Sequence, residues 1–171
     1  GETVQLNGVE IPVVERFPIN LSTNERFGFE LNLSYRKGRK WNINSNFNLY
    51  TNKVVGSYED LVFDNESLSW SFRLNNKLTL PGKIEWQTRM NYRGPEETAI
   101  TKRDGNFSVD LAFSKELFND NASLTFNVRD LLDQGGWKTE TFNQTFYNDS
   151  EYRWRQRSYT LNFTYRFNQK K

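Results

Sequence analysis

The stretch that most constrains the fold of this chain is the alternating segment from Tyr159 to Phe167. Polar side chains occupy its even positions, and its odd positions are Tyr159, Leu161, Phe163, Tyr165 and Phe167. Successive side chains of a β-strand point to opposite faces, so the segment predicts a strand with one apolar and one polar face. Alternating strands of this kind are typical of transmembrane β-barrels.

The same alternation recurs along the chain. Further alternating segments run through residues 25–35, 41–49, 68–78, 84–92, 107–113 and 124–128. Most reach about nine to eleven residues, the length that a tilted strand needs to cross the hydrocarbon core of a bilayer. The last strand is expected to begin near Glu151. The apolar parity shifts between Trp154 and Tyr159, which indicates either a bulge or a segment that has left the membrane. We therefore expect an all-β, antiparallel transmembrane β-barrel with about seven to eight strands in this chain.

The connections between these segments alternate in length. Short turns fall at 36–40, 81–82 and 119–121, and long polar connections fall at 53–66, 93–104 and 130–149. Transmembrane barrels have short periplasmic turns and long extracellular loops. The pattern therefore predicts that the short turns and the C-terminus lie on the periplasmic side. Residues 1–24, interrupted by Pro12 and Pro18, are expected to form a partial strand and an extracellular loop before barrel strands at 25–171.

Aromatic side chains cluster near the predicted strand ends. Aromatic residues form girdles at both interfaces of membrane barrels. The candidate membrane-interface aromatics on the short-turn side are Tyr35, Trp41, Trp86, Tyr165 and Phe167, and those on the long-loop side are Trp70 and Tyr92.

The polar faces of the predicted strands carry charge. The charged residues there are Arg73, Lys77, Glu85, Arg89, Asp110 and Arg129. A packed soluble core does not tolerate unpaired charges, whereas a hydrated lumen or a protein plug does. A soluble β-sheet protein that binds carbohydrate through exposed Trp and Tyr remains an alternative, because period-two patterning alone does not separate the two.

The composition argues against catalysis. The chain has no Cys and no His, so it lacks a disulfide framework and the central residue of Ser-His-Asp triads and of most zinc sites. The net charge of +2 gives no sign of a nucleic-acid partner. We expect no enzyme activity and no cofactor. The run from Arg153 to Arg157 has two interpretations, an anion-binding patch or arginines paired within the wall.

Several segments near the C-terminus resemble those of a known family. They are Asn127-Val-Arg-Asp-Leu-Leu-Asp133, Thr139-Glu-Thr141, Trp154-Arg-Gln-Arg157 and Phe163-Thr-Tyr-Arg-Phe-Asn-Gln-Lys-Lys171. Together they are similar to the C-terminal end of TonB-dependent outer-membrane receptors, within the group of outer membrane β-barrel family receptors. The resemblance implies a barrel of about 22 strands around a plug, in the bacterial outer membrane, for TonB-powered uptake of a scarce ligand.

The same resemblance implies the partners: outer-membrane lipid, the N-terminal strands and plug of the receptor, TonB and the barrel-assembly machinery. Because at most eight strands are visible and no plug or TonB box is seen, we expect the C-terminal third of such a receptor. A self-contained small barrel with an adhesion or structural role is the alternative. Residues Tyr159, Leu161, Phe163, Tyr165 and Phe167 are the candidate assembly signal, which β-augmentation of an edge strand would recognise.

Overall fold

The computed structural model describes residues 3–13, 23–58, 61–98, 100–142, 146–153 and 156–167. All the regular structure in these residues is β-strand, in thirteen strands. The described residues include no helix long and apolar enough to cross a membrane. The fold is all-β and antiparallel, as the alternation predicts.

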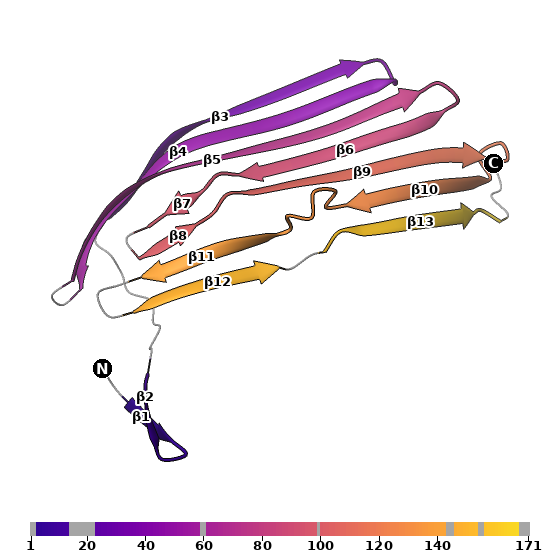
Figure 1. The fold of residues 1–171 in the computed structure, drawn as a ribbon. Helices are drawn as coiled ribbons and strands as arrows, with labels where there is room; N and C mark the ends of the chain where they lie inside the picture. Colours follow the sequence, from indigo (N-terminus) through magenta and orange to yellow (C-terminus); the bar gives the residue numbers. More distant parts are fainter. Residues whose placement is uncertain are drawn as a thin grey trace.

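Seven strands form the main sheet, in the order β13-β10-β9-β6-β5-β4-β3 (Figure 1). The bounds of these strands are β3 Thr23–Lys37, β4 Trp41–Tyr58, β5 Leu61–Leu80, β6 Ile84–Arg93, β9 Asn106–Leu117, β10 Ala122–Arg129 and β13 Ser158–Tyr165. Every neighbouring pair is antiparallel. The sheet is a single layer, and its two outermost strands, β3 and β13, each pair on one side only within the described residues.

Three tight turns join strands at one end of this sheet. Gly38 has a φ of 56° in the first turn, and Gly82 and Lys83 have φ of 79° and 58° in the second. In the third turn Phe118, Asn119 and Asp120 all have positive φ. Glycine, asparagine and aspartate tolerate this left-handed region best. Lys83 and Phe118 adopt it beside such residues, Gly82 and Asn119, within the same turns. The three predicted short turns are confirmed at one end of the sheet.

The three long connections are not open loops, contrary to the expectation from the sequence. Strands β4 and β5 continue pairing from Lys53↔Glu66 to Tyr58↔Leu61. The second connection forms β7 (Glu96–Glu97) and β8 (Thr101–Arg103), and the third forms β11 (Gly136–Phe142) and the first three residues of β12 (Tyr147–Arg153). In these segments neither face of the extended hairpins is uniformly apolar, so the sequence shows no alternation. The backbone hydrogen bonds between the strands continue nevertheless, because they do not depend on the side chains.

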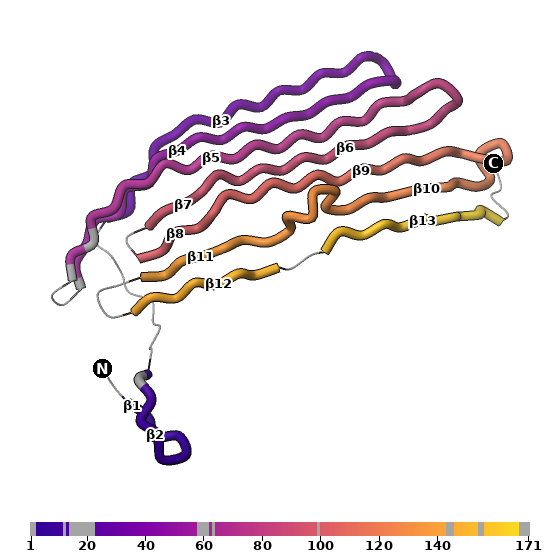
Figure 2. The backbone as a smooth tube through the Cα atoms, viewed as in Figure 1, coloured from indigo at the N-terminus to yellow at the C-terminus, as the bar shows by residue number. Residues whose placement is uncertain are grey.

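Strands β12-β11-β8-β7 make a four-stranded sheet that extends the main one beyond its long-loop end (Figure 1). The path from β9 to β8 is shorter than the neighbouring path from β10 to β11. Ten residues lie between Val128 and Thr139, whereas seven lie between their partners Leu111 and Arg103 on the neighbouring strand. The three extra residues leave the sheet as a compact loop after Asp130, visible as a bend in the tube between β10 and β11 (Figure 2).

The chain ends also differ from the expected boundaries. The described part of residues 1–24 contains a hairpin rather than one partial strand, formed by β1 (Thr3–Leu6) and β2 (Val9–Pro12). Its turn is Asn7-Gly8, with φ of 52° and 80°, a residue pair typical of two-residue hairpin turns. At the other end, two strands, β12 and β13, replace the single strand expected from Glu151 to Phe167. Pro18, Trp154, Lys170 and Lys171 lie outside the described residues.

Candidate functional site

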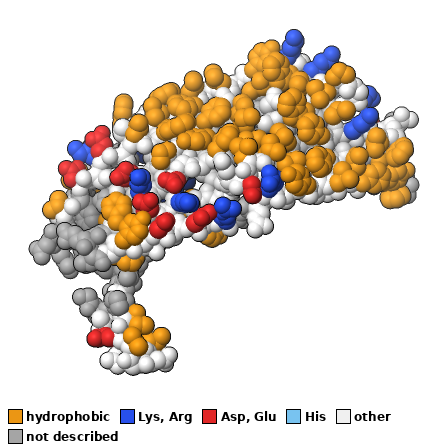
Figure 3. Space-filling view, in the orientation of Figure 1, with side chains coloured by type: hydrophobic (Ala, Val, Ile, Leu, Met, Phe, Trp, Pro, Cys, Tyr) orange, Lys and Arg blue, Asp and Glu red, His pale blue; other side chains and the backbone are white. Residues whose placement is uncertain are grey.

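The apolar side chains of all seven strands lie on one face of the main sheet. Paired residues in an antiparallel register share a face, and the register aligns Leu31, Phe47, Phe72, Tyr92 and Phe107 in one row across five strands. This face is open: Phe27 is 82 % exposed and Leu161 is 66 % exposed. Figure 3 shows these hydrophobic side chains spread over the sheet, with charged side chains gathered at its two ends. The sheet therefore presents a broad apolar surface that no other layer of the described residues covers.

A row of aromatic rings crosses this apolar face towards the long-loop end. The ring centroids of Phe29 and Phe47 lie 5.8 Å apart, and those of Phe47 and Trp70 lie 6.3 Å apart. Trp70 packs on Tyr92 at 4.3 Å, and Tyr92 lies 6.2 Å from Phe107. The predicted residues Trp70 and Tyr92 are therefore brought together as the middle of a five-ring row.

A second group of aromatic residues lies beside the short turns. Tyr35 and Trp41 flank the first turn with an edge-to-face contact at 5.4 Å. The indole Nε1 of Trp41 donates to Oδ1 of Asn76 at 2.8 Å, so its polar atom is satisfied on an apolar face. Trp86 stacks on Phe113 at 6.1 Å across the next strand pair. Tyr165 contacts Phe167 at 4.6 Å at the end of the last strand.

On β5 the two groups are separated by Phe72, Leu74 and Asn76, which lie on the same face. Leu78 on β5 pairs with both Trp41 and Trp86. It lies eight residues from Trp70 on the same strand. At about 3.3 Å per residue this is about 26 Å along the strand. The apolar band of outer-membrane barrels is about 25 Å tall, and strand tilt shortens the projected height here to about 20 Å. The predicted interface aromatics did not include Phe29, Phe47, Phe107 and Phe113, although the alternation places all four on the apolar face.

The opposite face of the sheet is polar and begins with an asparagine network on β3 and β4. Asn46 donates through Nδ2 to Oε1 of Glu30 and to Oδ1 of Asn32, both at 2.7 Å. Asn48 in turn donates to Oδ1 of Asn46 at 2.7 Å, and Ser34 donates to Asn44 at 3.0 Å. Amide side chains can donate and accept at once, so this ladder satisfies its own members while remaining open to water.

Cations dominate the polar face on the next strands. Arg73 and Arg89 donate from Nε to the amide oxygens of Asn91 and Asn75, at 3.3 and 3.4 Å. Lys77 forms an ion pair with Glu85 at 2.8 Å. The polar face also contains a hollow of about 420 Å³. Its charged lining residues are Lys77, Arg89, Asp110 and Arg129. The six charged residues predicted for the polar face all lie there.

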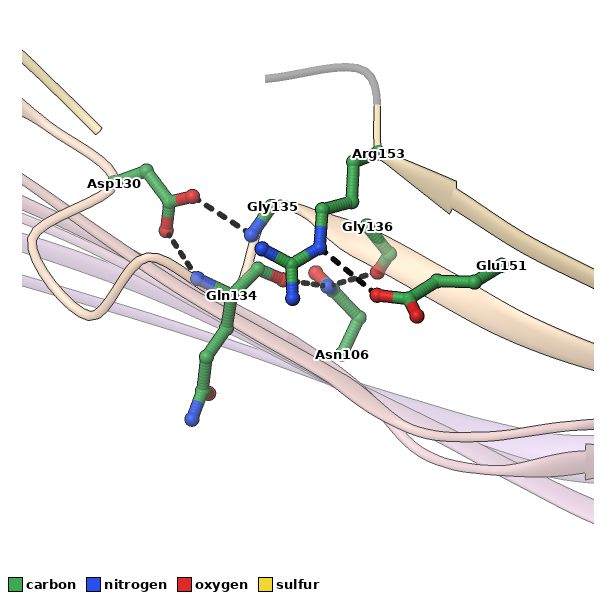
Figure 4. Close-up of polar contacts among 7 residues, drawn as sticks. All are labelled: Asn106, Asp130, Gln134, Gly135, Gly136, Glu151 and Arg153. Atoms are coloured by element: carbon green, nitrogen blue, oxygen red, sulfur yellow. Dashed lines mark hydrogen bonds and ion pairs between the residues drawn. The ribbon is translucent and has the colours of Figure 1, made fainter. Parts of the chain in front are cut away.

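A buried carboxylate organises the loop between β10 and β11 (Figure 4). Asp130 is 1 % exposed, and its two carboxylate oxygens accept the backbone amides of Gln134 at 3.2 Å and Gly135 at 2.7 Å. Its own amide donates to Oδ1 of Asp110 on β9 at 2.9 Å. From the far side, Nδ2 of Asn106 donates to the carbonyls of Gln134 and Gly136. The motif used for the family resemblance thus forms a closed turn tied to the sheet.

In the described residues, the arginines of the run near the C-terminus contact neighbouring residues of the same sheet and of the loop after β10. Arg153 Nε donates to Oε1 of Glu151 at 2.8 Å, and this hydrogen bond and the guanidinium charge lower the pKa of Glu151. The Arg157 amide donates to Oδ1 of Asp133 at 3.1 Å, and its guanidinium donates to the Leu131 carbonyl at 3.4 Å. These contacts favour the interpretation of arginines paired within the wall. The described residues hold no group of three or more potential metal ligands.

Comparisons with known proteins agree with this arrangement of faces. One family model, described as the "Outer membrane protein beta-barrel family", matches residues 2–165. Searches of curated proteins and of solved structures gave no match.

Proposed function

This chain belongs to the outer membrane protein beta-barrel family, and from that premise we propose that it forms part of the wall of a TonB-dependent uptake receptor. The family places it in the bacterial outer membrane, in contact with lipid. The finer proposal is that a large barrel surrounds a plug and imports a scarce ligand with energy supplied through TonB. In this proposal the chain has no catalytic role, and its short turns and C-terminal end face the periplasm.

The open edges of the sheet support a barrel with more strands than this chain provides. β3 and β13 lie at opposite edges of the seven-stranded sheet, and within the described residues neither has a second partner strand. An unpaired strand edge within a bilayer leaves backbone groups unsatisfied, which lipid does not tolerate. Strands supplied by another part of the receptor would pair with both edges and close the barrel.

The polar face supports a wide interior that is filled by water or protein. Small barrels of eight strands fill their interior with their own side chains. Here Arg73 and Arg89 have amide partners rather than carboxylates, and Arg129 has no ion pair among the described residues. Unneutralised guanidinium groups require water or an acidic protein surface opposite them. This observation carries the choice of a wide barrel that holds water or a plug over a small barrel filled by its own side chains.

Conductance of the complete gene product in planar bilayers tests the proposal. A plugged barrel is expected to conduct little in buffer and to open wide, reversible channels in urea, which unfolds a plug before it unfolds the barrel. The purified gene product should also bind the periplasmic domain of TonB. Conductance that is large in buffer, or absent in both conditions together with no TonB binding, would contradict the proposal.

The two alternatives predict different behaviour of the isolated 171-residue chain. A self-contained small barrel with an adhesion or structural role would fold alone in detergent and change its electrophoretic mobility on heating. A soluble carbohydrate-binding sheet would remain monomeric without detergent. The exposed apolar face, with Phe27 at 82 % exposure, disfavours the soluble alternative because monomeric proteins rarely leave so broad an apolar surface uncovered.

A further inference from the structure

The short-turn end of the apolar face carries a group of cations, which we call the basic collar. It consists of Lys37, Arg39, Lys40, Lys83 and Lys115, all of them exposed. Figure 3 shows lysine and arginine side chains at this end of the sheet without acidic neighbours in that view, whereas acidic and basic side chains mix at the other end.

The register directs two collar residues towards lipid. Lys37 pairs with Trp41, and Lys115 pairs with both Ile84 and Leu124, so each lies on the apolar face. Lys115 is also the next residue on that face of β9 after Phe113, a member of the short-turn aromatic group. Arg39, Lys40 and Lys83 lie in the turns that immediately follow the apolar band.

The carboxylates at this end do not neutralise the collar. Glu85 pairs with Lys77 at 2.8 Å, and Glu116 pairs with Arg166 at 3.1 Å. Asp120, in the third short turn, lies beside the same Arg166, whose guanidinium donates to the Asp120 carbonyl. Register places both of these pairs on the polar face, opposite to Lys37 and Lys115. Within the described residues no collar side chain has an ion-pair partner. Among the described residues the collar is therefore a cationic strip without ion pairs at the edge of a membrane-facing surface.

We propose that the basic collar binds the phosphate groups of anionic phospholipids in the leaflet at the short-turn end of the barrel. Phosphates are the anions found at the depth where an apolar band ends, and lysines on that face reach them by extending along the aromatic belt. The collar binds phosphatidylglycerol-type headgroups in preference to zwitterionic ones and so anchors the wall at a fixed depth. Assignment of this leaflet to the periplasm rests on the proposed orientation, but the lipid preference does not.

Photo-crosslinking of the complete gene product in vesicles measures this preference directly. Phosphatidylglycerol and phosphatidylcholine, each with a diazirine near the glycerol end of one acyl chain, are compared at equal, low fractions in both leaflets. Peptides that contain collar residues should crosslink about five-fold more with phosphatidylglycerol, the factor contributed by one well-placed lysine near an anionic surface. High salt should reduce this ratio towards one.

A triple variant and a matched control separate the collar from general charge. Lys37→Gln, Lys83→Gln and Lys115→Gln together should move the ratio clearly towards one, with Arg39 and Lys40 retained. Lys53→Gln, Lys102→Gln and Lys138→Gln at the other end should leave it unchanged. A ratio near one in the unmodified protein, or equal losses in both triple variants, would overturn the proposal. The crosslinking ratio of the unmodified protein tests the lipid preference even if a variant fails to fold. This test is independent of TonB binding and of conductance.

Discussion

The amide of Asp130 donates to a carboxylate oxygen of Asp110 at 2.9 Å, which fastens the loop after β10 to the polar face of β9. Two aspartates lie this close because one contributes a backbone donor and the other an acceptor. The Asp130 side chain faces away into the loop, where it accepts the amides of Gln134 and Gly135. The loop therefore leaves the sheet at a point set by hydrogen bonds, not by apolar packing.

Replacing Asp130 should loosen this loop. Asp130→Asn keeps one acceptor oxygen and leaves one of the two loop amides unpaired, at an expected cost of about 1–3 kcal/mol. Asp130→Ala loses both acceptors and also places alanine at a φ of 50°, which adds strain. Hydrogen exchange at Gln134 and Gly135 should accelerate in the order Asn, then Ala. Asp104→Asn, which removes an exposed carboxylate, is the control; equal exchange in all variants would show that the carboxylate does not hold the loop.

Gly28 should not tolerate a larger residue. A Cβ added there would meet the Leu49 carbonyl oxygen and Tyr50, which pairs with Gly28 and holds Arg26 over its ring at 3.5 Å. Because the obstacle is largely backbone, Gly28→Ala must separate β3 from β4, at a cost of about 1–3 kcal/mol. The denaturation midpoint of the folded gene product should fall clearly. Ser34→Ala on the same face of β3 removes only a hydroxyl hydrogen bond and should change the midpoint much less; similar shifts would refute the close-contact argument.

The limits of sequence reasoning are clear at particular residues. Alternation predicted the faces of the seven long strands because lipid and water impose it on side chains such as Phe47 and Asn48. It failed at 53–66, where the backbone ladder of a hairpin holds without an apolar face. It was silent on Asp130, whose hydrogen bonds depend on loop geometry. The Asn7-Gly8 turn carried a readable hairpin signal that the proline-based interpretation overlooked.

Pairing between β11 and β12 should depend on pH through Glu151. The hydrogen bond from Arg153 on the same strand, then its charge, and finally the charge of Lys138 across on β11 lower the pKa of Glu151. The ionised carboxylate therefore stabilises the folded hairpin. A lowered pKa means that this contribution is present above the usual pKa of a glutamate and is lost as the pH falls through the depressed value. Amide exchange in β11 and β12, corrected for its intrinsic pH dependence, should therefore accelerate at acidic pH. Glu151→Gln should remove this dependence; an unchanged profile would assign it to another group.

The apolar face of the last strand should be needed for assembly. Leu161 pairs with Phe126 and Phe163 pairs with Leu124, while the other edge of β13 has no partner within the described residues and can receive a strand from an assembly factor. Changing Phe163, Tyr165 and Phe167 together to Ser removes the face that both lipid and such a factor would contact. The folded, surface-exposed fraction of the complete gene product should fall several-fold.

A matched control on the same strand separates the apolar face from strand formation in general. Asn162→Ser with Thr164→Ser alters the polar face of β13 over the same span, and it should leave assembly close to normal because neither side chain faces lipid. Surface levels measured by protease shaving, together with heat-modifiable mobility, distinguish loss of insertion from loss of expression. If the polar-face variant fails as badly as the aromatic one, the strand pairing rather than its apolar face carries the signal. If neither variant fails, the C-terminal strand has no role as an assembly signal.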